Sequence, residues 1–235
     1  MSDLMLHCGS ARVNRDALAS VPTPRSTQTW KPVPHIQVAE LVCQETADRG
    51  YEVVSEEYGL NPAGTKMFGV LRFHPEGHPE YSRCIGFRNS HDKSMALGIT
   101  AGLAIVVCDN LCFGGETTFH RKHTSGIEVE GLIPEAFNNL AYQFQRLEDN
   151  VAEMKLRPIS ISGAKLLTVQ AAEEKVIASC DILPVLKEFR EPRHEEFKTQ
   201  NLWSLYNSFT ELAKKYSPAR ADKCYRGLSK LFALA

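Results

Sequence analysis

The residues most able to bind or react gather between Arg88 and Thr124, in three short polar segments. The first is Arg88-Asn-Ser-His-Asp-Lys-Ser94, which is longer than the roughly two to five residues of an ordinary hairpin turn. The second, Cys108-Asp-Asn110, follows an apolar stretch, and the third is the dense basic cluster His120-Arg-Lys-His-Thr124. Five of the eight histidines lie between residues 65 and 125. We therefore expect the functional surface in this stretch.

Basic and aromatic residues alternate through the same region, a combination that favours nucleic-acid binding. Basic side chains contact phosphates, and aromatic rings stack on bases without demanding a particular sequence. The predicted contacts to DNA are Arg72, Arg88, Asn89, His91, Lys93, Arg121, Lys122 and His123. The alternative is that the aromatic rings are core and the charges a solvated face. The net charge of −1 excludes a global attraction, so a local basic groove would have to hold the nucleic acid.

A Cys/His cluster offers a second chemistry. Cys108, Cys112, His120 and His123 supply two thiols and two imidazoles, a ligand set that suits tetrahedral zinc. Their spacing is not that of a familiar zinc finger or ribbon. A zinc-dependent hydrolase or nuclease would add His91 or Asp92 as a ligand or general base. The alternative is a buried Cys108, an incidental Cys112 and solvated histidines, and both interpretations stay open.

Two further catalytic patterns carry little weight. Ser90, His91 and Asp92 have the residue types of a catalytic triad, but neighbours on an extended strand point to opposite faces. The sequence has no Gly-x-Ser-x-Gly elbow around a serine. Gly114-Gly115 is not followed by the residues of a phosphate-binding loop, and no dinucleotide-binding fingerprint occurs. Binding is thus favoured over catalysis.

Residue periodicity predicts an α+β fold, in which an antiparallel β-meander precedes a long amphipathic helix and a helical C-terminal region. A short helix is expected over residues 35–49, followed by strands over 51–58, 66–74, 81–89 and 95–108. Short connections between these strands favour antiparallel pairing. Apolar residues then recur at steps of three and four from Phe137 to Met154, after Pro134 in the expected first turn. Further helices are expected near 162–175, 183–190, 201–216 and 218–233.

The domain organisation follows from these elements. Residues 1–33 hold a segment rich in Pro, Ser and Thr and are predicted to be a flexible arm, with Trp30 as its possible anchor. Residues 34–158 form the predicted α+β core domain, and 159–235 a helical region packed on it. A third functional hypothesis uses the arm and the C-terminal helices as the interface of a protein-interaction module that inhibits a host defence system.

A cytoplasmic location is the default expectation. Its seven scattered cysteines are expected to be reduced thiols, and the N-terminus lacks the pattern of a secretory signal. No apolar run reaches the roughly 20 residues of a membrane span, so no membrane partner is expected.

The motifs Phe87-Arg-Asn-Ser-His-Asp-Lys-Ser94, Val106-Val-Cys-Asp-Asn-Leu111 and Arg121-Lys-His-Thr124 resemble those of a family of phage- and plasmid-like proteins. That family is known only as a domain of unknown function, and the resemblance spans roughly residues 35 to 215. It implies a gene of a phage, plasmid or other mobile element, and it carries over no catalytic residue. The expected topology is also similar to that of single-strand annealing proteins of the Rad52 type, which bind single-stranded DNA as ring oligomers. The near-neutral charge departs from what a dedicated DNA binder would show.

The leading prediction is therefore a non-enzymatic, oligomeric protein that binds DNA, expected to be single-stranded, as a recombination or annealing accessory. A host recombination or defence protein is a further expected partner.

Overall fold

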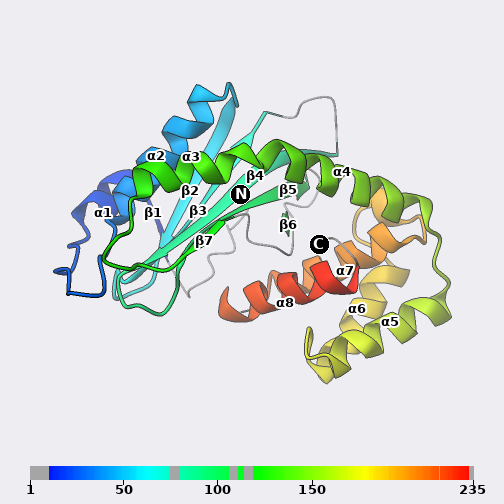
Figure 1. Cartoon of the computed structure of the whole chain (residues 1–235). Coiled ribbons are helices and arrows are strands. Elements are labelled where there is room, and N and C mark those ends of the chain that lie inside the picture. The colour runs from blue at the N-terminus through cyan, green and yellow to red at the C-terminus, as the bar shows by residue number, and fades with distance from the viewer. Residues whose placement is uncertain (1–10, 75–79, 106–110, 114–118, 217, 233–235) are drawn as a thin grey trace.

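The computed structural model describes residues 11–74, 80–105, 111–113, 119–216 and 218–232. Within them, seven strands form one antiparallel sheet, in the order β1-β2-β3-β4-β5-β6 with β7 also paired to β5. The strands are β1 (Ala11–Val13), β2 (Val53–Leu60), β3 (Lys66–Phe73), β4 (Tyr81–Ser90), β5 (Leu97–Ile105), β6 (Leu111–Phe113) and β7 (Phe119–Arg121). The sheet is the long layer that runs across Figure 1.

Helices and short 3-10 turns make up most of the remainder. The α-helices are α1 (Arg15–Ser20), α2 (His35–Asp48), α3 (Val129–Asn138), α4 (Leu140–Leu156), α5 (Ile161–Glu173), α6 (Ile182–Arg190), α7 (Leu202–Ala213) and α8 (Pro218–Leu231). The 3-10 turns are η1 (Ser179–Asp181) and η2 (Glu195–Phe197). In Figure 1, α2, α3 and α4 run over the sheet, and α5 to α8 gather at one end. This arrangement confirms the predicted α+β class, a meander followed by a helical region.

Strand alternation decides which side chains meet the helices, because successive residues point to opposite faces of a sheet. On β4, Arg83 reaches Glu148 of α4 with its Nε 2.8 Å from Oε1. The odd-numbered positions of β4, among them the buried Ile85 and Phe87, therefore face the helical layer. Small residues such as Gly86 lie on the opposite face.

The long amphipathic helix differs from the prediction in its start and its continuity. Helix α3 begins at Val129, so Pro134 lies inside a helix rather than in a first turn. A break at Asn139 then separates α3 from α4. The apolar pattern does not show this break, because Ile133, Phe137 and Leu140 on both sides of it are buried in the same core.

The proline-rich segment also differs from its predicted flexible form, from residue 11 onward. Asn14 caps α1 by accepting a hydrogen bond from the Ala17 amide at 2.9 Å. Leu18 is 1% exposed, and Trp30 and Val33 are buried as well. Burial of these apolar side chains offsets the entropy of ordering the segment, despite its poor propensity for regular structure. Residues 1–10 of the predicted arm lie outside the described residues.

The C-terminal helices continue the core of the sheet domain. Leu147 of α4 and Leu205 of α7 belong to the same cluster of buried apolar residues. An isolated bridge between Pro158 and Asn201 ties the end of α4 to the start of α7. The division of the chain at residue 158 into two regions stays a prediction.

Two simpler observations complete the fold. In the described part of the chain, no helix combines the length and apolar character needed to cross a membrane. The cysteines described there are Cys43, Cys84, Cys180 and Cys224, and each is a free thiol.

Candidate nucleic-acid interface

Residues 30–35, here called the strap, cross one end of the sheet. Trp30 forms a bridge with Thr124, just beyond β7, and the Lys31 amide donates to the His123 carbonyl at 3.3 Å. At its other end the strap enters α2 at His35. The strap thus joins the region after β7 to the helical layer, across the hairpins of β2–β3 and β4–β5.

Side chains from β4 and its hairpin hold the middle of the strap. The Val33 carbonyl accepts from Asn89 Nδ2 and His91 Nε2, each at 2.8 Å. Asn89 Nδ2 also lies 2.9 Å from His35 Nδ1, and His35 Nε2 lies 3.1 Å from the Gly64 carbonyl. An amide nitrogen only donates, so His35 accepts at Nδ1 and carries its proton on Nε2. The network therefore selects the neutral form of His35.

Three buried histidines meet at this point. The rings of His35 and His91 stack with centroids 3.8 Å apart and planes 3° from parallel. Burial, together with the nearby His91, lowers the pKa of His35 to about 4. Burial likewise lowers the pKa of His91 and of His123. At neutral pH all three rings are uncharged.

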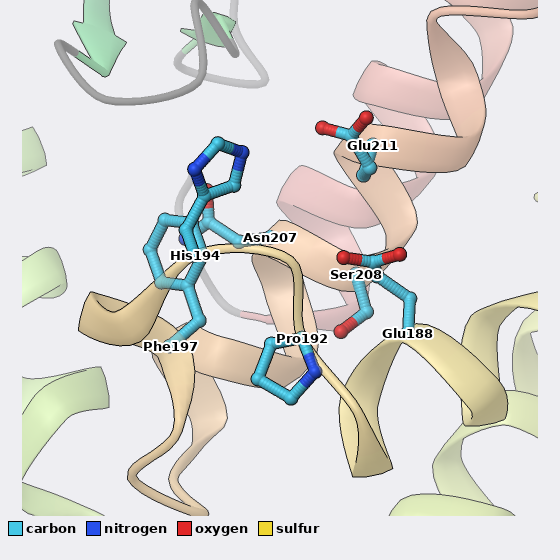
Figure 2. A pocket seen from close by; sticks show the side chains of 7 residues that line it. All are labelled: Glu188, Pro192, His194, Phe197, Asn207, Ser208 and Glu211. Carbon is cyan, nitrogen blue, oxygen red and sulfur yellow. The ribbon is translucent and has the colours of Figure 1, made fainter.

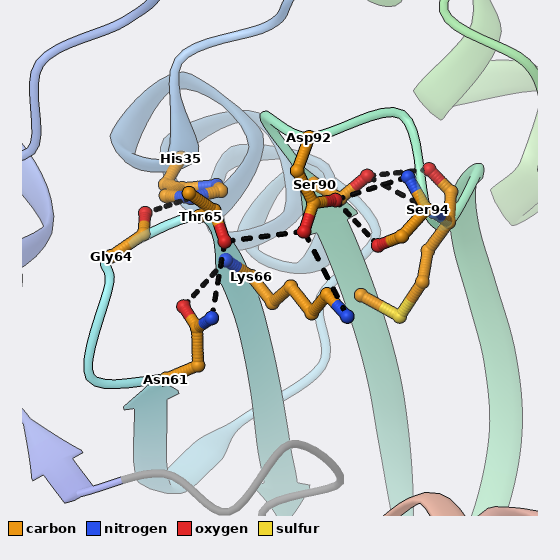
Figure 3. A network of polar contacts seen from close by, with 9 residues as sticks. His35, Asn61, Gly64, Thr65, Lys66, Ser90, Asp92 and Ser94 are labelled. Carbon is orange, nitrogen blue, oxygen red and sulfur yellow. Dashed lines mark hydrogen bonds and ion pairs between the residues drawn. The ribbon is translucent and has the colours of Figure 1, made fainter.

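The hairpin between β4 and β5 is held in one conformation by Asp92 (Figure 3). Asp92 Oδ1 accepts from the Ser94 amide at 3.0 Å and also from the Ser94 hydroxyl. Asp92 Oδ2 accepts from Thr65 Oγ1 at 3.2 Å and lies 3.8 Å from Lys66 Nζ. Lys93, between these anchors, has a φ of 62°, in the left-handed region. Such a conformation persists only where its surroundings impose it.

Exposed cations surround the strap and come from three segments far apart in the sequence. They are Lys31, Lys93, Arg121 and Lys122, here called the cationic patch. Lys93 Nζ lies 4.9 Å from the centre of the Trp30 ring. Arg121 pairs with Leu97 at the start of β5, and Lys31 Nζ contacts the Ile127 carbonyl at 3.3 Å. The patch is thus assembled by the strap, the hairpin and the end of β7.

The predicted DNA-contacting residues separate into three groups. Lys93, Arg121 and Lys122 are exposed and lie in the cationic patch. Asn89, His91 and His123 are 0%, 5% and 6% exposed, so their side chains do not face a ligand. Asn89 and His91 hold the strap with their side chains, whereas His123 contacts it through its backbone carbonyl. The two remaining residues, Arg72 and Arg88, lie on the sheet face opposite α4, since Arg88 and Cys84, the partner of Arg72, are at even-numbered positions of β4.

Arg72 is also distant from the patch along its strand. Lys66 pairs with Ser90 at the end of β3 near the strap, and Arg72 pairs with Cys84 farther along. Six residues of a strand span about 20 Å, which separates Arg72 from the cationic patch. Both Arg72 and Arg88 are half-buried.

The predicted zinc ligands lie largely outside what the structure describes. Cys108 lies outside the described residues, as do the side chains of Cys112 and His120. His123 is described, and neither of its buried ring nitrogens has a hydrogen-bond partner. Among the described side chains, no group of three or more His, Cys, Asp or Glu residues could hold a metal ion. The zinc hypothesis stays a prediction.

The Ser90-His91-Asp92 run does not form a relay. The Ser90 hydroxyl donates to the Met95 carbonyl at 2.7 Å and accepts from the Met95 amide at 3.1 Å. His91 donates to the Val33 carbonyl, and Asp92 binds Ser94. Each residue therefore has a structural partner of its own.

A second polar site lies among the C-terminal helices (Figure 2). Its lining residues are Glu188, Pro192, His194, Phe197, Asn207, Ser208 and Glu211. Arg193 pairs with Glu188 at 3.1 Å and with Glu211 at 2.8 Å, and Lys214 also pairs with Glu211. The two carboxylates are thereby neutralised by cations of the same chain, so the pocket presents no strong charge to a ligand.

Reasoning from the sequence missed the strap. Trp30 lies within a run of prolines, which predicts loose backbone, and only its size indicated an anchor. No role was predicted for His35, because it lies far from the three polar segments along the chain. Of those segments, the first and third meet at the strap, while residues 108–110 lie outside the described residues.

The comparisons with known proteins identify a family without a known activity. Neither the curated proteins nor the solved structures contain a match to this chain. One family model matches, described as "Domain of unknown function (DUF932)", and its match extends over residues 25–234. That range includes the strap, the cationic patch, the sheet from β2 onward and the C-terminal helices. The chain belongs to the DUF932 family of domains of unknown function.

Proposed function

We propose that the protein binds single-stranded DNA through the cationic patch, as a non-enzymatic recombination or annealing accessory of a phage, plasmid or other mobile element. The observation that carries this proposal is that the exposed Lys93, Arg121 and Lys122 belong to segments that contact the strap, which itself carries Lys31. Their sequence positions are separate, and the fold gathers them at one end of the sheet. The proposal also places the protein in the cytoplasm and in a homo-oligomer.

Local charge matters more than net charge for this kind of binding. Phosphates interact with cations within about 8 to 10 Å at physiological ionic strength, so a patch can act in a chain of net charge −1. Asp92 is a nearby carboxylate; its oxygens already accept from Ser94 and Thr65, and it forms an ion pair with the Lys66 ammonium at 3.8 Å. Its charge is partly compensated before a ligand arrives.

The fixed conformation of the β4–β5 hairpin also supports binding through the cationic patch. The Asp92 contacts hold the hairpin, and the Trp30 ring lies beneath the Lys93 ammonium. Ordering a flexible lysine on binding costs about 0.5–1.5 kcal/mol, and a held hairpin reduces that cost. The mobile-element context rests on the resemblance of the three sequence motifs.

The test measures binding of a labelled single-stranded oligonucleotide against salt concentration. The variant combines Lys93→Gln, Arg121→Gln and Lys122→Gln. Removal of three phosphate contacts should weaken binding by roughly tenfold or more at low salt. It should also reduce the slope of log K against log salt by about 2, because each contact on a single strand contributes about 0.7.

A matched control removes three charges from exposed lysines of the C-terminal helices: Lys165→Gln, Lys187→Gln and Lys223→Gln. This control has the same net charge as the patch variant and should bind like the wild type. Equal weakening by both variants would show that only net charge matters. Wild-type affinity that is undetectable at low salt, or that does not change with salt, would refute the proposal.

A further inference from the structure

Trp30, the first residue of the strap, lies outside the main apolar cluster of the fold. It is only 9% exposed, yet the cluster of buried residues that joins the sheet to the helices contains Val33 and not Trp30. Backbone contacts fix its position: the Trp30 carbonyl accepts from the Thr27 amide at 2.8 Å, and Trp30 forms a bridge with Thr124. The strap thus holds an indole ring beside the cationic patch rather than within this cluster.

The indole nitrogen of Trp30 has no hydrogen-bond partner among the described residues. A buried indole N–H usually has one, and an unsatisfied buried donor reduces stability. A leucine or a phenylalanine would fill apolar space without a polar atom to satisfy. Packing alone therefore does not explain why a tryptophan occupies this position, whereas a role of the ring in binding would.

One face of the Trp30 ring is covered by Lys93, whose Nζ lies 4.9 Å from the ring centre. The backbone of Lys93 belongs to the hairpin that Asp92 holds through its bond to the Ser94 amide. Its side chain, in contrast, is exposed and extends through four flexible carbons. The ammonium can therefore leave the ring while the strap and the hairpin stay in place.

A nucleobase is a stronger partner for this ring than the lysine ammonium. A cation over an exposed aromatic ring changes an equilibrium constant by about two- to fivefold. Stacking of one base on an aromatic side chain changes it by about five- to 150-fold. The displaced ammonium still contributes to binding, because it can contact the phosphate next to the stacked base. The exchange therefore favours the bound strand.

We propose that Trp30 is the base-stacking residue of the cationic patch: a base of the bound strand displaces the Lys93 ammonium from the ring, and Lys93 then contacts the adjacent phosphate. The inference rests on the proposed binding of single-stranded DNA, and it adds a contact to the bases that the cations of the patch do not supply. The bases of a duplex are already paired and stacked on one another, so this contact selects single strands. The strap and the hairpin keep their backbone contacts throughout.

The first experiment compares two single-stranded oligonucleotides that have the same number of phosphates, an oligothymidylate and an abasic strand of equal length. Both should bind the wild-type protein in a salt-dependent manner, and the oligothymidylate should bind at least about fivefold more tightly. Only the oligothymidylate should quench the tryptophan fluorescence. Trp30→Phe assigns this signal, because the remaining Trp203 is 3% exposed in α7 and should not respond.

A substitution then tests whether the Trp30 ring contacts the bases. Trp30→Leu keeps an apolar side chain in the strap and removes the ring. The preference for the oligothymidylate should fall from about fivefold or more to less than about twofold, while the affinity for the abasic strand stays within about twofold of the wild type. Tyr142→Leu is the matched control. The exposed Tyr142 ring also lies beneath a cation, with Arg146 Cζ 5.8 Å from its centre, but it belongs to α4 and not to the cationic patch. Its removal should leave the preference unchanged.

The outcomes separate the stacking role from the proposed function. Salt-dependent binding of both strands with equal affinity, or quenching that does not differ between them, would overturn the stacking role alone. Absence of binding to both strands would refute the proposed function and the inference with it. An equal loss of affinity for both strands in Trp30→Leu would show that Trp30 only supports the patch, which also overturns the inference. Far-UV circular dichroism verifies that this variant is folded, and if it is not, the comparison of the two strands on the wild-type chain decides.

Discussion

The ring of His35, on the first residue of α2, stacks on the ring of His91, which directly follows β4, with centroids 3.8 Å apart. This contact joins the helical layer to the sheet at the point where the strap crosses. Its strength depends on protonation, because two charged rings would repel each other at this distance. Stability should therefore depend on pH in a predictable direction.

The pKa of His35 is about 4 in the folded chain, whereas an ordinary histidine, as in the unfolded chain, has a pKa of 6.5. The unfolded chain therefore binds the proton more tightly. The associated stability is fully present above pH 6.5 and is lost as the pH falls toward 4. The loss should reach about 3–4 kcal/mol, from roughly 1.4 kcal/mol for each pH unit between 6.5 and about 4. Urea unfolding at several pH values measures it. His35→Gln should flatten this part of the profile, and parallel profiles for the two proteins would contradict the assignment.

Removal of the Glu148 carboxylate should weaken the attachment of α4 to the sheet. Glu148→Gln removes the negative charge and one of the two oxygens that accept from Arg83, at 2.8 and 3.1 Å, in a site where the Glu148 side chain is 9% exposed. We expect a loss of about 1–3 kcal/mol in the free energy of unfolding. Glu153→Gln is the control, since its pair with Arg157 is more than half exposed and should contribute less than about 0.5 kcal/mol. Equal effects of the two substitutions would contradict the prediction.

Gly69 should not tolerate a larger residue. A Cβ at this position would lie 2.2 Å from Cζ of Phe87 on the neighbouring strand. Gly69→Ala should therefore reduce the unfolding free energy by about 1–3 kcal/mol, measured by urea denaturation. The cost should shrink in a Phe87→Leu background, where the ring is absent. Gly126→Ala has no atom within 4 Å of the new Cβ and should be nearly neutral.

Replacement of Lys175 by glycine should stabilise the protein. It follows the C-cap of α5 with a φ of 60°, and its amide donates to the Ala172 carbonyl at 3.1 Å. Glycine reaches this left-handed conformation without steric cost, so Lys175→Gly should raise the unfolding free energy by about 0.5–1 kcal/mol. Lys165→Gly, in the middle of the same helix, should lower it by about 1 kcal/mol. Destabilisation by both substitutions would show that the Lys175 conformation is not strained.

Local pattern predicted most of the fold. Alternation along residues 66–73 and the helical spacing from Phe137 to Met154 follow from the periods of strand and helix, which are properties of the chain alone. The break at Asn139 did not appear in that pattern, because a short interruption leaves the apolar face continuous. The ordered segment 11–33 did not appear either, since its order comes from burial of Leu18, Trp30 and Val33 against distant residues.

The candidate site was predicted in part. The dense polar segments near residues 88–94 and 120–124 identified the region, and three of its exposed cations lie in the patch. The roles of Asn89, His91 and His123 were missed, because the same polar side chain can face solvent or satisfy a buried backbone group. Sequence alone does not distinguish these two environments.

The sequence by itself determined the class of the fold, the order of its elements and the region of unusual polar residues, because periodicity and composition are local quantities. Tertiary structure alone decided that Trp30, Lys31 and His35 join residues 91–93 and 121–123 at one end of the sheet. Such convergence depends on strand register and on the packing of α2. It brings together side chains separated by up to about ninety positions, for which no local pattern exists.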